Sequence, residues 1–425
     1  GALAATDQVP LDALEDAMFI GELSLDGQLR HVKGVISCAY AAWQQGLTTI
    51  YVPEEDAPEA ALIPELEVIP TPSLGHLVEH LYGLQLIPAL RRDQLPPAED
   101  ASLLHRLVDF AEIKGQEHVK RALEVAAAGA HNVLMSGPPG SGKTLMAKAL
   151  PGVLPAMTLE EALEVTRIYS VADLLPDDSP LVQARPYRSP HHTISQAGLV
   201  GGGRIPRPGE VTLANRGVLF LDEFGEFGRS ALEVMRQPME DKQVTISRAS
   251  GTLTFPANFM LVAAMNPCPC GYYGDPAHEC SCSSSQIRRY QQSISGPLLD
   301  RIDIHVNVPR VDYDKLTSIV EGEASAIVRA RVEEARSRQY KRFTAQKHLL
   351  ANADMGPGDI RQHCQLTPGA ESLIKVTLRQ MQLSARAYHR ILKLGLTIAD
   401  LAGCEVVDVP HLAEAIQYRP RRSTV

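Results

Sequence analysis

The spacing of hydrophobic and polar positions predicts a small mixed α/β domain over the first 90 residues. Residues 21–27 alternate like a strand and contain an Asp-Gly turn signal. A helix is expected over 35–43, followed by a short strand over 49–52 that a proline ends. These elements indicate a domain with a core of its own.

Beyond residue 130, apolar runs of strand length alternate with helical patterns. Such alternation is typical of a mostly parallel sheet covered by helices. The runs expected to form its strands are 131–135, 218–221, 259–264 and 302–308. From about residue 313 only helical patterns follow, and the last of them opens at Asp408 with Pro410 inside its first turn.

The boundary between the first two regions is marked by residues 88–100, which combine proline and arginine with few apolar anchors. The predicted organisation is an α/β domain at 1–90, a linker at 91–104, an α/β core at 105–310 and a helical domain at 311–425. Because the chain begins Gly-Ala rather than Met, we expect part of the first domain to precede it.

The bulk composition narrows the function classes. The 425 residues are 44% hydrophobic and 21% charged, as in ordinary globular proteins. No apolar run reaches the roughly 18 residues that span a membrane, and no signal peptide is visible. Seven cysteines are few for this length, so a reducing, cytoplasmic setting is expected. With a net charge of -9, any contact with nucleic acid must come from local basic loops.

One segment carries a complete phosphate-binding pattern between a strand-like run and a helix-forming run. Its positions are filled by Gly137, Pro138, Pro139, Gly140, Ser141, Gly142, Lys143 and Thr144. Glycines allow backbone N–H groups to turn toward phosphates, and the start of the helix adds its positive end. Lys143 is expected to reach the outer phosphates of ATP, and the Thr144 hydroxyl to bind Mg²⁺.

Polar side chains end two of the predicted strands. Asp222 and Glu223 follow the run at 218–221, at the strand end where an open α/β sheet binds its ligand. We expect Asp222 to hold the Mg²⁺ shell and Glu223 to orient or deprotonate the attacking water. Asn266 follows the next strand and would position that water, although a strand-end asparagine is also common in simple turns.

The motifs occur in a fixed order, namely the phosphate loop, LFLDEF, AAMNP, SGPLLDRID and LSAR. This order resembles the magnesium-chelatase-like group of AAA+ proteins over nearly the whole chain. The resemblance implies an AAA+ P-loop core with a parallel sheet and a helical lid. It also implies that Arg301 is an arginine finger reaching a neighbouring subunit's nucleotide and that Arg386 is a second sensor arginine. From sequence alone, either arginine could instead be a surface ion-pair residue.

Two segments are candidates for touching a substrate. One is the Gly-, Pro- and Arg-rich stretch 185–207, and the other is 244–255, whose alternating β-branched residues predict a hairpin. The resemblance places both in the central pore of a ring, where the DNA-binding residues would be Arg204, Arg207, Lys242 and Arg248. The alternative is a role in ring packing or in binding a partner protein.

Four of the cysteines lie in one short loop and have the composition of a tetrahedral zinc site. The candidate ligands are Cys268, Cys270, Cys280 and Cys282, with His278 as a possible competitor. The alternative is four reduced thiols without a metal. A bound Zn²⁺ would brace the loop that follows Asn266.

The N-terminal region resembles the Lon-protease-like domain found in this family. The stretch 34–38, where the Lon lysine is expected, contains none, and Lys33 beside it reads as a surface residue. We therefore interpret the domain as a non-proteolytic module for protein interaction or for facing DNA.

The resemblance implies a hexameric, ATP- and Mg²⁺-dependent motor that moves on single-stranded or branched DNA through its pore. Within the family, it points to a helicase for branch migration of recombination intermediates during natural transformation. A chelatase-type subunit that remodels a protein partner is the alternative. An ATP-dependent protease is disfavoured by the missing lysine.

Overall fold

The computed structural model describes residues 1–94, 108–176, 179–203, 206–248, 251–311, 322–346 and 349–419. They form two compact units. The first unit comprises Gly1–Ser102 and Met157–Ala184, and the second comprises Leu103–Ala156 and Arg185–Val425. Most of the predicted linker at 91–104 lies outside the described residues.

The first unit is built on a three-stranded parallel sheet of order β1-β4-β5. Gly34 is the N-cap of helix α2, and its φ of 81° lies in the left-handed region that favours glycine. The elements of this unit are α1 (Ala2–Ala5), η1 (Asp12–Leu14), β1 (Ala17–Phe19), β2 (Glu22–Leu23), β3 (Leu29–Arg30), α2 (Val35–Gln44), β4 (Thr49–Pro53), η2 (Glu54–Asp56), α3 (Ala57–Ala60), β5 (Glu67–Thr71), α4 (Leu74–Leu81), η3 (Arg92–Gln94) and α8 (Leu159–Ala172).

Helix α8 comes from within the range 105–310, for which the sequence predicts a single core, yet it belongs to the first unit. Its Leu163 packs against the apolar core of that unit. The hydroxyl of Ser170 donates a hydrogen bond to the buried carboxylate of Glu59. Asp173 pairs with Lys33 at 2.6 Å, so this lysine forms a surface ion pair. The apolar face of α2 explains the difference, because α8 covers it.

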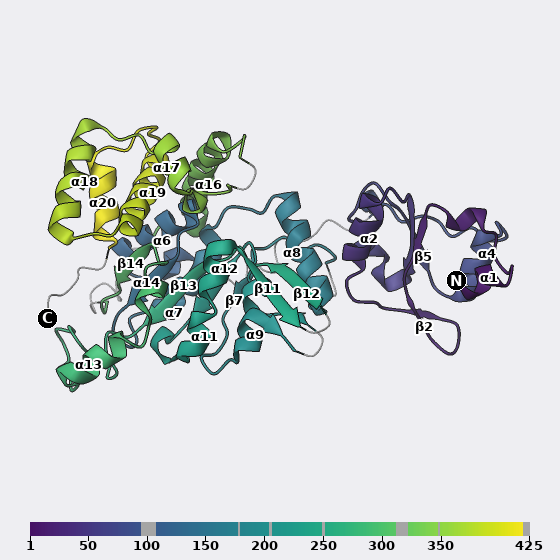
Figure 1. Cartoon of the computed structure of the whole chain (residues 1–425), viewed down its shortest axis with the longest axis horizontal. Coiled ribbons are helices and arrows are strands. Elements are labelled where there is room, and N and C mark those ends of the chain that lie inside the picture. The colour runs from purple at the N-terminus through teal and green to yellow at the C-terminus, as the bar shows by residue number, and fades with distance from the viewer. Residues whose placement is uncertain are drawn as a thin grey trace. The chain divides into compact units, whose positions relative to one another are not determined.

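The second unit contains the predicted parallel sheet, with strand order β14-β6-β13-β10-β7 (Figure 1). All neighbouring strands run parallel. The four predicted strands are confirmed as β6 (Val133–Ser136), β10 (Val218–Leu221), β13 (Met260–Met265) and β14 (Ile304–Asn307). The edge strand β7 (Tyr187–Arg188) was not predicted, because it lies in the Pro- and Arg-rich stretch read as a loop.

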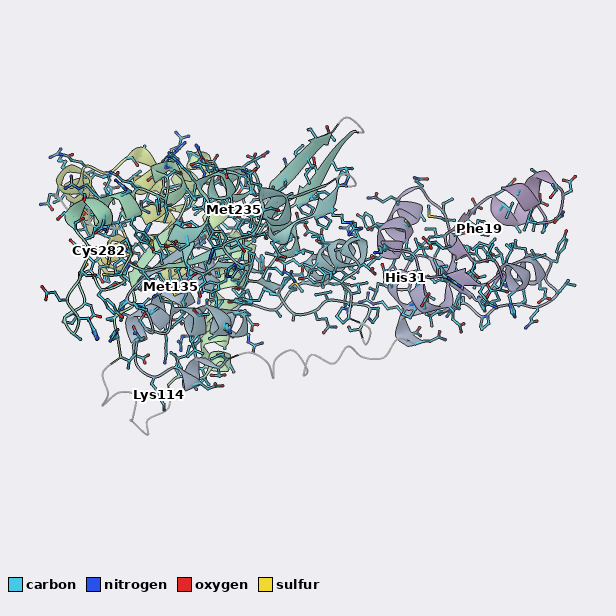
Figure 2. All side chains as sticks on the ribbon, turned by 90° about the horizontal axis from the view of Figure 1, so that it is seen from below. Phe19, His31, Lys114, Met135, Met235 and Cys282 are labelled. Carbon is cyan, nitrogen blue, oxygen red and sulfur yellow. The ribbon has the colours of Figure 1, made fainter. Side chains whose placement is uncertain are left out.

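The three central strands of this sheet, β6, β13 and β10, are buried on both faces. Val133 and Met135 of β6 join a core shared with the C-terminal helices, whereas Leu134 between them joins the core on the other face. Met135 accordingly lies among the packed side chains in Figure 2. Continuous apolar runs are expected for strands covered by helices on both sides.

Helices and short ribbons surround the sheet. Around the core these are η4 (Phe110–Glu112), α6 (Glu117–Gly129), α7 (Lys143–Ala149), η5 (Leu150–Val153), α9 (Gln196–Val200), β8 (Gly201–Gly202), β9 (Arg207–Pro208), α10 (Glu210–Leu213), η6 (Phe224–Glu226), α11 (Arg229–Glu233), α12 (Arg236–Asp241), α13 (Ser284–Gln291) and α14 (Gly296–Leu299). The predicted hairpin forms from β11 (Gln243–Arg248) and β12 (Gly251–Pro256).

The C-terminal part contains only helices among its described elements. They are α16 (Ser325–Arg342), η7 (Asn352–Asp354), α17 (Pro357–His363), α18 (Pro368–Met381), α19 (Ala385–Leu401) and α20 (Val409–Gln417), and Figure 1 shows them gathered into a lid. Asp408 is the N-cap of α20, as the sequence predicts. No helix within the described ranges combines the length and the apolar character that crossing a bilayer requires.

Candidate nucleotide site and its surroundings

The phosphate loop connects the end of β6 to the start of α7. Gly140 and Gly142 have φ of 74° and 90°, which lie in the left-handed region and which side chains rarely adopt. A Cβ on Gly137 would lie 2.1 Å from the carbonyl oxygen of Val308, so only glycine fits there. The loop therefore has the backbone shape that turns N–H groups toward bound phosphate.

Lys143 is held in the mouth of this loop. Its Nζ donates hydrogen bonds to the carbonyl oxygens of Gly137 at 2.8 Å and Pro138 at 2.9 Å. It also lies 3.4 Å from Oδ1 of Asn266. Burial lowers the pKa of the Lys143 ammonium, and the charge of Asp222 acts against that shift. A cation held among oxygens at this position suits the outer phosphates of a nucleotide.

The two expected ligands of the Mg²⁺ shell are in direct contact. Oγ1 of Thr144 donates a hydrogen bond of 2.7 Å to Oδ2 of Asp222. The other carboxylate oxygen of Asp222 accepts a bond of 2.9 Å from the backbone N–H of Glu223. Oxygen ligands from a hydroxyl and a carboxylate, side by side, fit the preference of Mg²⁺.

Glu223 has an unusual backbone and an unexpected partner. Its φ of 51° is left-handed, which is costly for a residue with a side chain and is common at functional sites. Oε2 of its carboxylate lies 3.0 Å from Nδ1 of His192, and 57% of the side chain remains exposed. The candidate base is therefore accessible to water and linked to the stretch 185–207.

The structure brings the expected nucleotide residues to one edge of the sheet. Asn266 directly follows β13, as Asp222 follows β10 and the phosphate loop follows β6. Since all three strands are parallel neighbours, their carboxyl ends meet there. The arrangement can hold a nucleoside triphosphate, a magnesium ion and an attacking water.

Arg301 lies at the opposite end of the strands, where the strands of the sheet begin. Strand β14 runs parallel to β6 in register from Ile304 opposite Val133 to Asn307 opposite Ser136. Arg301 precedes the start of β14, whereas the phosphate loop follows the end of β6. A strand of four residues rises about 13 Å, so the length of the sheet separates the two.

The guanidinium of Arg301 makes its contacts on that far side. Nη1 donates a hydrogen bond of 2.6 Å to the carbonyl oxygen of Pro297. Nη2 pairs with the carboxylate of Glu240 in α12. Arg386, exposed in the first turn of α19, adds its charge to that of Arg301 in lowering the pKa of Glu240, after the hydrogen bond from Arg301 itself. Both candidate arginines thus belong to the same side of the unit.

The cysteine cluster has the geometry of a closed metal site. The four Sγ atoms lie within 4.8 Å of one another. Cys268 and Cys280 are 3.7 Å apart, and Cys270 and Cys280 are 3.5 Å apart. Tetrahedral zinc with bonds of about 2.3 Å requires sulfur separations of about 3.8 Å, so the four thiols fit this ion. The ring of His278 is occupied elsewhere, since it stacks on Tyr272 and faces Asp275.

The same loop abuts the nucleotide site. Gly271 has a left-handed φ of 87°, and a Cβ placed on it would lie 2.6 Å from Cδ of Pro139 and 3.8 Å from Cγ of Asn266. The loop held by the cysteines therefore packs directly on the phosphate loop. We therefore expect a conformational change in the cysteine loop to shift the phosphate loop, and the reverse.

The candidate DNA-binding residues are only partly described. Arg207 is exposed in β9. Lys242 lies 3.7 Å from Asp354 of the lid, so its ammonium takes part in an ion pair. Arg204 and the side chain of Arg248 lie outside the described residues. Strand β12 is exposed from Gly251 to Thr254, whereas Val244 and Ile246 of β11 pack in the core, so only the turn end of the hairpin projects.

Two residues of the site were missed by sequence reasoning. His192 contacts Glu223, and Glu240 holds Arg301. His192 lies in a stretch that the sequence had marked, but no spacing rule connects it with a strand-end glutamate 31 residues away. Glu240 carries no sequence signal, because an acidic residue at the end of a helix is ordinary.

A phosphate loop, a strand-end Asp-Glu pair and a helical lid on a parallel sheet define the class of protein as AAA+, a class of P-loop proteins. The families described as "Magnesium chelatase, subunit ChlI" and "Magnesium chelatase, subunit ChlI C-terminal" match residues 109–316 and 322–419. A third match, "Subunit ChlI of Mg-chelatase", covers residues 1–56. The chain belongs to this magnesium-chelatase-like AAA+ family.

Known proteins agree with this assignment. The chain is 42% identical to "Competence protein ComM" of Haemophilus influenzae over 99% of its own length and 81% of the relative. It is 41% identical to the uncharacterized protein YifB of Escherichia coli, over 98% of the chain and 80% of the relative. A stretch of 159 residues, 33% of the chain and 26% of the relative, is 33% identical to Lon protease 2 of Bacillus subtilis.

Proposed function

We propose that this protein is a ring-forming ATPase, hexameric by family resemblance, whose active sites are shared between neighbouring subunits. The observation that carries this proposal is the placement of Arg301 and the phosphate loop at opposite ends of the strands of one sheet. An arginine so placed lies far from the phosphate loop of its own subunit, which supports a role as an arginine finger for the nucleotide of another copy. A head-to-tail ring provides that arrangement at every interface.

The residues divide the chemistry as follows. The loop N–H groups and Lys143 hold the phosphates, while Thr144 and Asp222 hold Mg²⁺, which neutralises charge on the transferring phosphoryl group. Glu223 accepts the proton of the attacking water, and the amide of Asn266 orients that water. Arg301 of the next subunit then stabilises the charge that develops in the transition state.

DNA is the proposed substrate of the motor. The protein named for competence is similar over nearly the whole chain, which supports a competence-related role, and we propose single-stranded or branched DNA as the substrate in that role. The projecting hairpin, with Arg248, and the stretch carrying Arg204 and Arg207 supply local basic residues. The contact between His192 and Glu223 supports a link between that stretch and hydrolysis. Within this proposal, branch migration of recombination intermediates during natural transformation is the biological task.

The test is ATP hydrolysis measured with and without single-stranded or forked DNA. We expect DNA to stimulate turnover and Arg248→Ala or Arg207→Ala to reduce the stimulation. Lys375→Ala is the matched control, because it removes an exposed positive charge from the lid helix α18. Turnover that ignores DNA would instead favour a chelatase-type subunit acting on a protein partner, the alternative supported by the family matches.

We also propose that Cys268, Cys270, Cys280 and Cys282 hold one structural Zn²⁺. The sulfur separations support a tetrahedral site. Because Gly271 packs against Pro139, a metal bound there would stabilise the loop next to the phosphate loop. A rigid loop at this point would keep Asn266 in place beside the phosphate loop.

A further inference from the structure

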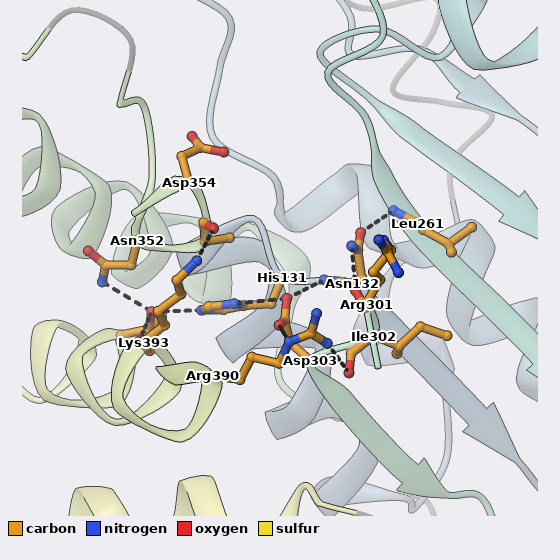
Figure 3. Close-up of polar contacts among 12 residues, drawn as sticks. His131, Asn132, Leu261, Arg301, Ile302, Asp303, Asn352, Asp354, Arg390 and Lys393 are labelled. Atoms are coloured by element: carbon orange, nitrogen blue, oxygen red, sulfur yellow. Dashed lines mark hydrogen bonds and ion pairs between the residues drawn. The ribbon is translucent and has the colours of Figure 1, made fainter. Parts of the chain in front are cut away.

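A buried polar network joins the loop that carries Arg301 to the helical lid (Figure 3). The loop consists of residues 300–303, between α14 and β14. Its partners come from lid helix α19 and from His131 and Asn132, which precede β6. Buried networks whose members are paired favour one arrangement over others, so this connection fixes a geometry.

On the lid side, Arg390 contacts the loop through a hydrogen bond and an ion pair. Its Nη1 donates a hydrogen bond of 3.0 Å to the carbonyl oxygen of Ile302. Its Nε lies 3.6 Å from Oδ1 of Asp303, with both side chains largely buried. Thr397, two turns further along α19, lies 2.9 Å from Nε2 of His131. The other nitrogen of that fully buried imidazole lies 3.4 Å from Oδ2 of Asp303.

On the sheet side, Asn132 holds the same loop. Its Nδ2 donates a hydrogen bond of 3.1 Å to the carbonyl oxygen of Arg301. Its backbone N–H donates to Oδ2 of Asp303 at 3.3 Å. Its Oδ1 accepts a bond of 2.8 Å from the N–H of Leu261 in β13. The loop is therefore held between the lid helix and β13, the strand that Asn266 follows.

Asp303 carries a charge at the centre of this network. Burial alone would raise the pKa of its carboxyl, but the hydrogen bond with His131 and the charge of Arg390 outweigh burial and hold the pKa below its usual range. A buried carboxylate of this kind depends on its partners, because removing one leaves charge uncompensated.

Helix α19 also carries Arg386, the candidate sensor. Arg386, Arg390, Lys393 and Thr397 are spaced by four, three and four residues, so they share one face of the helix. The charge of Arg386 acts on Glu240, the partner of Arg301. Arg386 therefore belongs to α19, and Arg301 is connected to the same helix through Arg390 and the loop 300–303.

We infer that Asp303 and Arg390 are positioning residues that lock α19 to the loop of Arg301, so that Arg386 and Arg301 reach the neighbouring nucleotide as one unit. This inference rests on the shared active site proposed above. Both positioning residues lie at the end of the strands opposite the phosphate loop of their own subunit. Their effect is confined to the subunit that donates the arginines.

A second ion pair of the same lid provides the matched control. Arg331 of α16 pairs with the buried carboxylate of Glu124 in α6 at 2.6 Å, so this pair also joins the lid to the core. In the described structure its hydrogen bonds go to Glu124 and Glu323 and not to the loop 300–303. Arg331→Lys should therefore lower the stability of the lid equally in the arginine donor and in the hydrolytic-site donor.

The experiment uses full-length subunits mixed so that each can play only one role. Glu223→Gln subunits donate arginines only, and Arg301→Ala subunits donate the hydrolytic site only. Asp303→Asn is then added to one kind of subunit at a time, and the ATP turnover of each mixture is compared with the parent mixture. Arg390→Lys, which keeps the buried positive charge, is run in parallel so that the result does not depend on the folding of Asp303→Asn.

We expect each substitution to lower turnover about ten- to a hundredfold when it is in the arginine donor, because small misplacements of a catalytic group are that costly. In the hydrolytic-site donor the change should stay within about twofold. Equal losses in both mixtures, or no loss in either, would overturn the positioning role. An inactive parent mixture would instead overturn the shared active site itself.

Discussion

The hydroxyl of Thr144 donates a 2.7 Å hydrogen bond to the carboxylate of Asp222, although 78 positions separate them in the chain. This contact joins the phosphate loop to the acidic strand end. It also separates the roles of two adjacent carboxylates, since Asp222 faces Thr144 whereas Glu223 faces His192.

We predict that Asp222→Asn raises the Mg²⁺ concentration needed for half-maximal ATP hydrolysis by about tenfold or more, because the variant loses a charged oxygen beside the ion. The measurement is an Mg²⁺ titration of turnover at saturating ATP. An unchanged titration midpoint would place the ion elsewhere.

Glu223→Gln is the paired variant and should behave differently. It keeps the shape of the side chain but cannot accept a proton, so turnover should fall about a hundredfold or more. ATP binding should be retained, as measured by fluorescence titration with a labelled nucleotide. Normal turnover in this variant would show that another group is the base.

His192→Ala tests whether the stretch 185–207 restrains the base. Loss of the 3.0 Å contact frees the carboxylate, and for a partly exposed pair the expected rise in DNA-free turnover is no more than about fivefold. The ratio of DNA-stimulated to DNA-free turnover should fall. His191→Ala is the control for the packing of the two rings, since His191 packs against His192 but bonds to Thr193 and not to Glu223. A normal ratio in His192→Ala would rule out this link.

Two glycines of the cysteine loop provide a matched pair. Gly271→Ala places a Cβ against Pro139, whereas Gly274→Ala meets nothing within 4 Å although its φ is also left-handed at 80°. Both variants bear the backbone strain, but only Gly271→Ala should disturb the phosphate loop, at a cost of about 1–3 kcal/mol. We expect weaker ATP binding in Gly271→Ala alone. Equal binding in the two would show that the loops are independent.

Metal analysis tests the zinc proposal directly. Freshly purified protein should contain about one Zn²⁺ per chain, and Cys280→Ser should lose it together with several degrees of melting temperature. Less than half an equivalent in the unaltered protein would remove the proposal.

The sequence predicted the sheet and the end of the sheet that binds nucleotide. Each strand there is an apolar run followed directly by a polar residue, and both features can be recognised within a short segment. Residues 133–135, 218–221 and 260–265 are apolar throughout, so burial on both faces was readable. The membership of α8 in the first unit was not readable, because it depends on a complementary face of α2 more than 100 residues away. The same holds for Asp303 with Arg390 and for Glu223 with His192, whose pairing is decided by tertiary packing.

The most direct test of the account mixes two variants that should each be inactive alone, Glu223→Gln and Arg301→Ala. If neighbouring subunits share each active site, about a quarter of the interfaces in randomly mixed rings pair an intact Glu223 with an intact Arg301. The mixture should then recover ATP hydrolysis that neither variant shows. A mixture as inactive as its components would contradict the account.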